Sequence, residues 1–467
     1  MLHSRSKNVV VNFKDLGSIV YFSMLHYLPV ALERVRGFRD IYPEDSEPRK
    51  RIFEVSEKAA EVFGFRKIEM PSVEHMDLYR IKSGDELVSQ CFTFQDKGGR
   101  QITLTPEATP TVVRMLTSRK DIPRPVRWYS FQKYWRYEEP QAGRQREFYQ
   151  FNGDIFGPSS AEVDAEVIGL AAFILNNLGL EGHYRILIND RSIMERVLLE
   201  NGIKDITRAF AIIDKFKKTD RDQFFLDLEE LGMPKDRVLD FCKMLEQVTP
   251  IELSESVIRN VIHYGDNDSQ VQRFLRLSKI LPAYSAETFF LDLSTVRGLA
   301  YYTGVVFEAF DVEGKFRSIL GGGRYDNLAQ LYSGQDIPAV GFGMGDAILE
   351  MLLKHKGLFG YDKKEQKFYV ATPDMTYYPS AVMLATKIRS NGIPAHLNIN
   401  ERNMGMQLKE ANKEGATDLI VLGKQEFESN NLTWKKLDSG KQISITYDAF
   451  LDLLAKRGLG EVVFPDS

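Results

Sequence analysis

Four short runs rich in β-branched and aromatic residues follow one another in the first third of the chain, with turn residues and few helical segments between them. The runs are 91–94, 102–104, 126–135 and 148–156, and the turns include Gly98-Gly99 and Gln141-Ala142-Gly143. Successive hairpins favour antiparallel pairing, because a parallel neighbour needs a long crossover connection. The sequence therefore predicts an antiparallel sheet rather than a doubly wound parallel one.

Helical patterns lie on both sides of these strands. Apolar residues recur at helical spacing over 47–63, and Gly64 ends that helix before a strand that closes at Pro71. A second helix is expected over 162–178. The charge-rich stretch 191–276 lacks strand patterning, which predicts an inserted helical subdomain.

The pattern changes near the C-terminus. A Gly/Lys-containing linker is predicted over 357–366, and beyond it short strands alternate with helices, which favours a small α/β domain with a mainly parallel sheet. That domain, 367–467, carries 12 basic and 12 acidic residues and is neutral. The larger α+β domain is expected from 33–190 and 277–356, and a poorly ordered extension over 1–32.

Composition narrows the class of protein. The 467 residues carry a formal charge of −4, which excludes a protein that binds nucleic acid by bulk positive charge. Two distant cysteines, Cys91 and Cys242, predict neither a disulfide framework nor a cysteine-held zinc, and favour a reducing cytoplasm. No apolar run is long enough to span a membrane, and Ser23, His26 and Pro29 interrupt the one signal-like stretch. Neither a P-loop nor a Rossmann glycine motif is present.

Two stretches concentrate groups that bind anions and rings. In 131–148 we expect Arg136 inside a strand and Arg144 and Arg146 at the return, where guanidinium groups can bind phosphate and Phe148 can stack on a base. A solvated hairpin with charge pairs is the alternative. In 297–304 a cation, two aromatic residues and two glycines adjoin a strand, although a Tyr-Tyr pair also suits core packing. Taken alone, the Gly321-Gly322-Gly323 triplet indicates a turn.

Taken together, residues 36–448 resemble the histidyl-tRNA synthetase family of class II aminoacyl-tRNA synthetases. The matching segments are the opening R-G-x-x-D at 36–43, the dimer-forming motif 1 at 47–71, motif 2 at 135–138, the histidine-specific peptide at 297–304 and its companion at 321–326. The resemblance implies an α+β fold: a class II antiparallel sheet flanked by helices, a helical insertion and a C-terminal α/β anticodon-binding domain. It also implies a homodimer.

The resemblance supplies roles for individual residues. For ATP it implies that Arg136 holds the α-phosphate and that Glu138 lies near the adenine, with Phe148 stacked on the base and Arg144 on the outer phosphates. Arg136 and Arg297 would be the catalytic groups. For histidine it implies these contacts: Glu107 and Thr109 on the amino group, Gln150 near the carboxylate, Asp154 and Tyr302 on the imidazole, with Tyr301 and Arg297 alongside.

The chain departs from the family pattern in three places. Ile348 stands where motif 3 has an arginine on the ATP γ-phosphate, so another cation or Mg²⁺ must neutralise the outer phosphates. Ala300 replaces an aspartate common in the histidine peptide, and Asp154 replaces a longer glutamate. The implied activity is ligation of histidine to tRNA(His) through histidyl-adenylate, with ATP as substrate, Mg²⁺, and no metal held by protein alone. The alternative is an inert regulatory subunit, like that of ATP phosphoribosyltransferase, that senses histidine.

Overall fold

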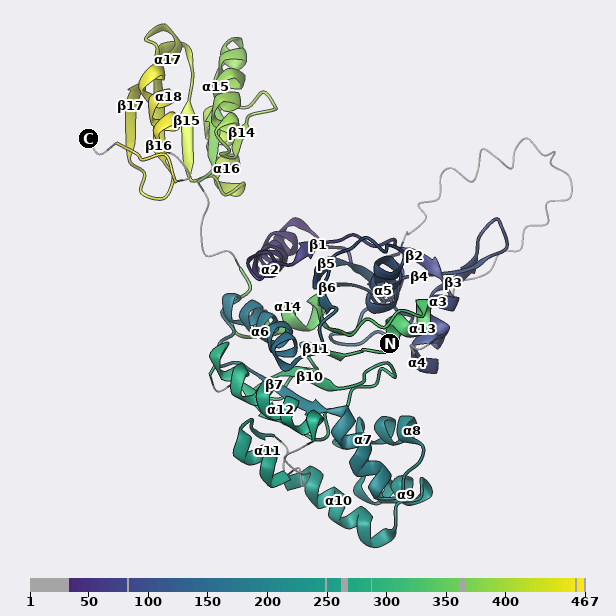
Figure 1. Ribbon diagram of the computed structural model, residues 1–467. Coiled ribbons are helices and arrows are strands. Elements are labelled where there is room, and N and C mark those ends of the chain that lie inside the picture. The colour runs from purple at the N-terminus through teal and green to yellow at the C-terminus, as the bar shows by residue number, and fades with distance from the viewer. Residues whose placement is uncertain are drawn as a thin grey trace, which may run out of the picture. The chain divides into compact units, whose positions relative to one another are not determined.

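The computed structural model describes residues 33–81, 84–247, 250–261, 268–286, 288–360, 366–457 and 460–465. The expectation for residues 1–32 lies outside these ranges. The chain divides into two compact units, Met1–Gly360 and Tyr361–Ser467 (Figure 1). In the described part of the chain, no helix is both long enough and apolar enough to cross a membrane.

A nine-stranded sheet is the centre of the first unit. Its order is β1 (Arg66–Lys67), β5 (Val126–Trp135), β6 (Glu147–Phe156), β12 (Ala339–Gly345), β11 (Leu320–Arg324), β10 (Val305–Asp311), β7 (Tyr184–Asp190), β9 (Phe289–Leu291) and β8 (Ile251–Glu252). Two neighbouring pairs, β1–β5 and β7–β9, are parallel, and the other pairs are antiparallel. The predicted antiparallel sheet is confirmed.

Helices cover both faces of this sheet. Helix α6 (Ala161–Asn177) packs its apolar residues against Phe151 and Phe342 on one face, in a core that also includes α2 (Pro43–Val62) and α14 (Asp346–His355). On the other face α5 (Thr109–Thr117) and α13 (Leu328–Ser333) pack with Tyr134, Tyr301 and Tyr325 (Figure 1). This second face is less densely filled with aliphatic side chains, and it carries the polar groups described below.

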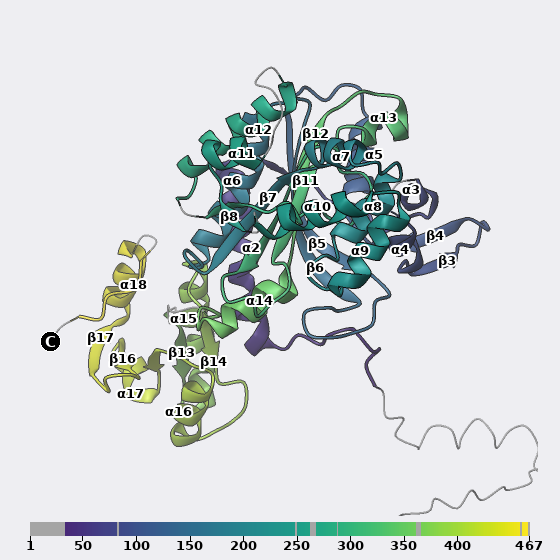
Figure 2. The same cartoon turned by 90° about the horizontal axis from the view of Figure 1, so that it is seen from below.

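Gly64 separates helix α2 from the edge strand β1, as predicted. Helix α2 ends before Gly64, whose φ of 78° is a conformation that glycine adopts without strain. Strand β1 is shorter than the predicted 65–71 run, because only Arg66 and Lys67 pair with β5. A small sheet of β2 (Val73–His75), β4 (Gln101–Leu104) and β3 (Thr93–Gln95) stands apart from the large one (Figure 2).

The inserted segment is mainly helical. It contains α7 (Arg191–Glu200), α8 (Ile206–Ile213), α9 (Arg221–Glu230), α10 (Lys235–Gln247), α11 (Glu255–Val261) and α12 (Ser269–Ile280). It also contains β8, which pairs with β9 and so extends the large sheet by one strand. The expectation of a segment without strands was wrong here, because two residues are too few to show an alternating pattern.

The second unit has a mixed sheet. Its order is β14 (Ala395–Leu397), β13 (Phe368–Ala371), β15 (Asp418–Val421), β16 (Asn431–Lys436) and β17 (Gln442–Thr446), with helices α15 (Tyr378–Ser390), α16 (Met404–Lys413), α17 (Lys424–Glu428) and α18 (Tyr447–Lys456). Strands β14, β13 and β15 are parallel, as predicted, but β16 and β17 form an antiparallel hairpin. The sequence analysis missed this hairpin. Trp434 on β16 is fully buried against Phe368 and Phe450, so the hairpin completes the core of the unit.

Candidate active site

Alternate residues of five neighbouring strands point to the face that α5 and α13 cover. Across β6, β12 and β11, one row of the sheet consists of Asp154, Gly341 and Gly323. The next row on the same face consists of Asn152, Gly343 and Gly321. Because side chains alternate along each strand, these residues share one face. The centre of this face therefore carries glycines, on β11 and β12, and longer side chains from β5, β6 and β10 surround them.

Two of these glycines leave room for specific charged side chains. A methyl group on Gly321 would overlap the guanidinium of Arg297, and one on Gly341 would overlap the carboxylate of Asp154. The expectation of a turn at the glycine triplet was wrong: Gly321 lies within β11. Glycine is required here because other side chains lie directly on the strand.

The hairpin of β5 and β6 carries a cluster of alternating charge. Arg136 lies one residue beyond β5, not inside it as predicted, although its backbone N–H still donates to Arg146 O at 3.0 Å. Its Nε donates to Pro106 O at 2.9 Å, and its guanidinium lies 5.4 Å from the centre of the Phe148 ring. The Glu138 carboxylate lies between two arginines, 3.0 Å from Arg144 Nε and 3.9 Å from Arg136 Nη1. Two cations sharing one carboxylate leave positive charge available for an anion.

A second buried carboxylate enters from the loop before α5. Glu107 is 3 % exposed, and the Tyr301 hydroxyl donates to its Oε2 at 3.0 Å. Burial, followed by the charge of Glu107, raises the pKa of the Tyr301 phenol, so the phenol stays protonated and remains a donor. Thr109 is the first residue of α5, and its hydroxyl interacts with the same phenol. An acidic group and a hydroxyl thus lie together at the Tyr301 phenol.

Asp154, on β6, is a further buried acidic group of this face. It is 3 % exposed, and the Tyr325 hydroxyl donates to its Oδ1 at 2.5 Å. Burial raises the pKa of the Asp154 carboxyl to about 7, although the hydrogen bond from Tyr325 opposes the rise. The Tyr325 ring lies 5.9 Å from the Tyr301 ring, which in turn lies 5.0 Å from the Tyr302 ring. Tyrosines thus connect the two carboxylates.

Arg297 is held in an unusual backbone conformation. Its φ is 60°, a region that residues with a Cβ seldom occupy, and such strain is concentrated at functional sites. Nη1 donates to Glu308 Oε1 at 2.6 Å, while the buried Nε has no partner among the described residues. Gln150, on the same face of β6, donates to Asn152 Oδ1 at 2.9 Å. The predicted residues from four separate segments therefore gather on one face of the sheet.

Ile348, which stands where motif 3 has an arginine, packs as a buried apolar side chain. It lies on the first turn of α14, and a methyl group on Gly143 would overlap it, so the hairpin loop lies on this side chain. Two residues earlier, Asp346 accepts hydrogen bonds from Arg39 Nη2 at 2.8 Å, from Tyr149 N at 3.0 Å and from Arg49. Asp346 thus engages Arg39 and Arg49, which reach α14 from the N-terminal part of the chain, whereas Arg144, next to Gly143, is half exposed.

Sequence reasoning assigned no role to several groups that shape this site. They are Tyr325, which holds Asp154; Glu308, which holds Arg297; and the buried hydroxyls of Ser130 and Tyr134. Polar residues at alternate positions of 130–136 were the available signal for the last two. Tyr325 and Glu308 become visible only through pairing with residues far away in the chain.

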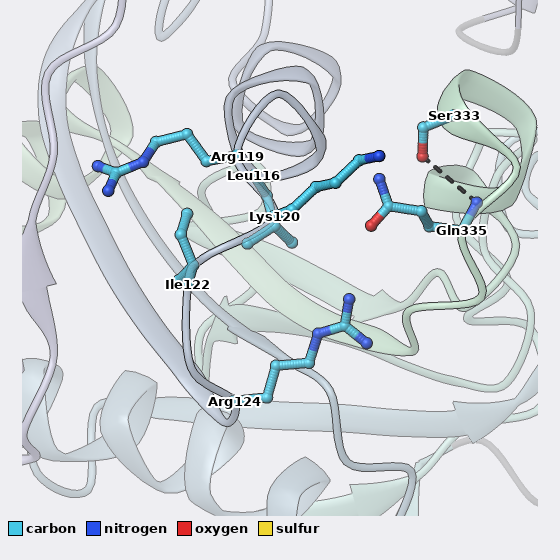
Figure 3. A pocket seen from close by; sticks show the side chains of 7 residues that line it. All are labelled: Leu116, Arg119, Lys120, Ile122, Arg124, Ser333 and Gln335. Atoms are coloured by element: carbon cyan, nitrogen blue, oxygen red, sulfur yellow. Dashed lines mark hydrogen bonds between the residues drawn. The ribbon is translucent and has the colours of Figure 1, made fainter.

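A separate pocket lies at the opposite ends of α5 and α13. It has a volume of about 400 Å³, and Figure 3 shows its lining by Leu116, Arg119, Lys120, Ile122, Arg124, Ser333 and Gln335. Arg119 is paired with Asp121 at 2.7 Å and is well exposed. These cations also follow the C-terminal end of α5, where positive charge is generally favourable. Across the described ranges, no group of three His, Cys, Asp or Glu residues could hold a metal ion.

The contact between Arg297 and Gly321 gives a first prediction. Gly321→Ala keeps every charged group but pushes the guanidinium away from the sheet, so we expect the ATP-dependent reaction to slow by roughly tenfold to a hundredfold. The rate under saturating substrates and the melting temperature should be measured together. Gly298→Ala is the control, because a methyl group there meets open space. Equal rates in the wild type and Gly321→Ala would contradict the close fit.

Comparisons with known proteins agree with this geometry. A family model described as histidyl-tRNA synthetase matches residues 37–346, and one described as anticodon binding domain matches 367–457. The chain is 47% identical over 425 residues to histidine–tRNA ligase of Thermoplasma volcanium, covering 91% of this chain and 99% of the relative. It is 44% identical over 424 residues to that of Picrophilus torridus, covering 90% and 99%. The crystal structure of histidyl-tRNA synthetase from Nostoc sp. has the same fold, with 20% identity, a TM-score of 0.76 and coverage of 92% and 100%. The chain belongs to the histidyl-tRNA synthetase family.

Proposed function

We propose that this chain joins histidine to tRNA(His), using ATP to form histidyl-adenylate. The observation that carries the proposal is the arrangement of the site: two buried carboxylates, Glu107 and Asp154, are linked through Tyr301 and Tyr325 and adjoin a hairpin with excess positive charge. We take the space between these carboxylates as the amino-acid pocket. An amino acid with a polar ring fits the pocket, and a triphosphate fits the hairpin. The 47% identical relative bears the name histidine–tRNA ligase.

In the first step a carboxylate oxygen of histidine attacks the α-phosphorus of ATP, and pyrophosphate leaves. The carboxylate is already ionised at neutral pH, so no general base is needed. The protein must align the two substrates and stabilise charge on the phosphorus. Arg136, anchored on Pro106, and Arg297, anchored on Glu308, are the groups for this task. We assign Gln150 to the attacking carboxylate.

Selection of histidine depends on polar groups that need a partner. Glu107 and Thr109 suit the ammonium group, and Asp154 suits an N–H of the imidazole. An apolar ring of similar size would leave the Asp154 carboxyl without its partner in a buried site. Such a mismatch is costly, so the pocket should reject phenylalanine-like side chains strongly.

We assign Phe148 and Glu138 to the base. Arg144, which is half exposed and shares Glu138 with Arg136, is the cation we assign to the outer phosphates. Mg²⁺ suits a site of this kind when phosphate oxygens supply most of its ligands, since it commonly binds proteins through only one or two carboxylates. It would add neutralising charge to the phosphates. Glu138 and Glu308 are the carboxylates that face this region.

In the second step a hydroxyl of the terminal ribose attacks the carbonyl of the adenylate, and AMP leaves. The second unit is the part of the chain assigned to the anticodon of tRNA. Because its formal charge is zero, contacts should depend on locally placed basic, amide and aromatic groups rather than on a broad positive field.

Pyrophosphate exchange with each of the twenty amino acids tests the proposal. We expect exchange with histidine alone, followed by transfer to tRNA(His) and not to other tRNAs. The regulatory alternative, which the ligase relatives do not favour, predicts histidine binding without exchange. That result in a well-folded protein would overturn the proposed function.

We also infer that the protein is a homodimer. Motif 1 in this family forms a twofold interface, and here α2 leads into β1, an edge strand with both residues exposed. Closed twofold symmetry is the commonest arrangement of oligomers. Light scattering at micromolar concentration should give twice the chain mass of 53.5 kDa. A fully active monomer would contradict this inference.

We expect the first unit to form adenylate by itself and the second unit to contribute to tRNA charging. Each has its own buried core, the first around α6 and the second around Trp434. A protein ending at Gly360 should therefore fold and form adenylate at a rate within a few-fold of the full chain, whereas aminoacylation should fall by roughly tenfold or more because the anticodon contacts are lost. Single-turnover adenylate formation and tRNA charging measure the two steps. Equal loss of both would mean that the second unit supports the catalytic fold.

We place the enzyme in the cytoplasm. Cys91 and Cys242 are both free and buried, and burial raises the pKa of both thiols. A raised pKa keeps them protonated and unreactive. Such cysteines are typical of proteins that work in a reducing compartment.

A further inference from the structure

Two buried hydroxyls on β5 have no partner among the described residues. They belong to Ser130, 1 % exposed, and Tyr134, 0 % exposed, which lie on the same face of the strand as Arg136. The large majority of buried side-chain polar atoms in folded proteins are hydrogen-bonded, and those that are not need an explanation. One explanation is a ligand that the site is built to receive.

The polar neighbours of these hydroxyls are engaged elsewhere. Gln132, between them on the strand, accepts from Met70 N at 3.1 Å. Asn152, opposite Ser130, accepts from Gln150 at 2.9 Å and donates to Phe342 O at 3.4 Å. The Asp154 Oδ1 atom accepts from Tyr325. Among the described residues, the groups around the two hydroxyls are thus satisfied, whereas Ser130 and Tyr134 have no hydrogen-bond partner beyond their interaction with each other.

The Tyr134 phenol lies among the groups assigned to histidine. Its ring belongs to the same buried cluster as Tyr301 and Tyr302 and lies 6.1 Å from the Phe148 ring. Burial raises the pKa of the phenol, as do the charges of Asp154 and Glu107, while a hydrogen-bonding interaction with Ser130 and the charge of Arg136 oppose the rise. The phenol thus lies in the same buried cluster as the tyrosines that hold the two carboxylates, and its raised pKa keeps it a hydrogen-bond donor.

The imidazole of histidine needs such a donor. A neutral imidazole has one N–H and one nitrogen that accepts, and Asp154 can take the N–H. Tyr302 was expected to bind the other nitrogen. Its phenol lies beside Arg297, which opposes the burial that raises the phenol pKa. Tyr302 therefore interacts with a charged group of the protein, whereas the Tyr134 hydroxyl has only the Ser130 hydroxyl as a neighbour among the described residues.

We infer that Tyr134 is a further specificity-determining residue: its hydroxyl donates a hydrogen bond to the imidazole of bound histidine, with the Ser130 hydroxyl beside it completing the polar end of the pocket. This inference rests on the proposed function. It adds a residue from β5 to the contacts that read the side chain.

Tyr134→Phe tests the inference, with Tyr129→Phe as the matched control. Tyr129 is equally buried on the same strand, but it faces the opposite side, with its ring 5.9 Å from Phe151. In pyrophosphate exchange we expect Tyr134→Phe to raise the histidine KM by roughly tenfold to a hundredfold, with kcat and the ATP KM within about threefold of wild type. Tyr129→Phe should leave the histidine KM within twofold.

A second measurement separates recognition of the ring from a general effect on the pocket. 2-Thienylalanine has an apolar ring that cannot accept from the phenol, so its inhibition constant should not worsen in Tyr134→Phe. The ratio of the inhibition constant of 2-thienylalanine to the histidine KM should therefore be at least tenfold smaller in Tyr134→Phe than in wild type. A parallel weakening of both ligands would assign Tyr134 to the shape of the pocket and overturn the inference.

A third variant covers a failure to fold. If Tyr134→Phe loses its cooperative thermal transition, Ser130→Ala, a smaller change, should still raise the histidine KM by roughly threefold to tenfold. An unchanged histidine KM in a folded Tyr134→Phe or Ser130→Ala protein overturns the inference while leaving the proposed function intact. Absence of exchange by the wild type would instead overturn the proposed function.

Discussion

Replacement of Arg297 by alanine should lower the single-turnover rate of histidyl-adenylate formation by roughly 10²–10³-fold, while the Kd for histidine changes only a few-fold. The guanidinium is preorganised by Glu308 and by its position over Gly321, and no described residue accepts a hydrogen bond from its Nε. Its interaction with phosphate should strengthen as charge develops on the phosphorus. Loss of one such preorganised contact typically costs about 3–4 kcal/mol of transition-state stabilisation. Rapid-quench kinetics with saturating ATP and histidine measures the step.

The pairing with Glu308 provides the control. If Arg297 only anchors the fold through this ion pair, Glu308→Gln should slow adenylation as much as Arg297→Ala does, and both variants should melt at lower temperature. If Arg297 acts on the phosphate, Glu308→Gln should retain most of the rate because the guanidinium remains. A folded Arg297→Ala protein with nearly normal adenylation would remove Arg297 from the reaction.

Replacement of Asp154 by alanine should raise the histidine KM by roughly 10–100-fold or more and leave the ATP KM nearly unchanged. The carboxyl is buried at the end of the pocket, where the imidazole has few other acceptors. Tyr325→Phe should give a smaller rise, because it removes only the hydrogen bond that orients the carboxyl. Steady-state exchange kinetics with each substrate varied in turn measures both effects. An unchanged histidine KM in Asp154→Ala would place this residue outside the pocket.

The raised pKa of Asp154 also makes stability depend on pH. Between about pH 4 and pH 7 the folded protein keeps a proton that the unfolded chain releases, so this group's contribution to the free energy of unfolding decreases as pH rises. Asparagine cannot ionise. The stability of Asp154→Asn relative to wild type should therefore increase from pH 5 to pH 8, by on the order of 2 kcal/mol. Melting temperatures of both proteins should be measured from pH 5 to pH 8. A difference between them that stays constant over this range would mean that Asp154 has an ordinary pKa.

Local sequence patterns were sufficient for much of the fold. Hairpin spacing predicted the antiparallel strands, and apolar periodicity predicted α2 and α6 to within a few residues. These features arise from contacts between residues near in sequence, which leave a visible period. The β16–β17 hairpin of the second unit was missed because its strands are short and mix polar with apolar residues.

The sequence by itself determined which chemical groups this protein carries and, through its motifs, the family to which it belongs. Only the tertiary structure decided how those groups pair. The register of β6, β12, β11 and β10 puts Gly341 under Asp154 and Gly321 under Arg297, although these partners are far apart in the chain. Burial, which exists only in the folded protein, raises the pKa of Asp154 and removes the hydroxyls of Ser130 and Tyr134 from water, with no other partner within the described ranges. Motifs record residues that are neighbours in sequence, whereas the pocket depends on desolvation and on contacts across strands, which no local pattern encodes.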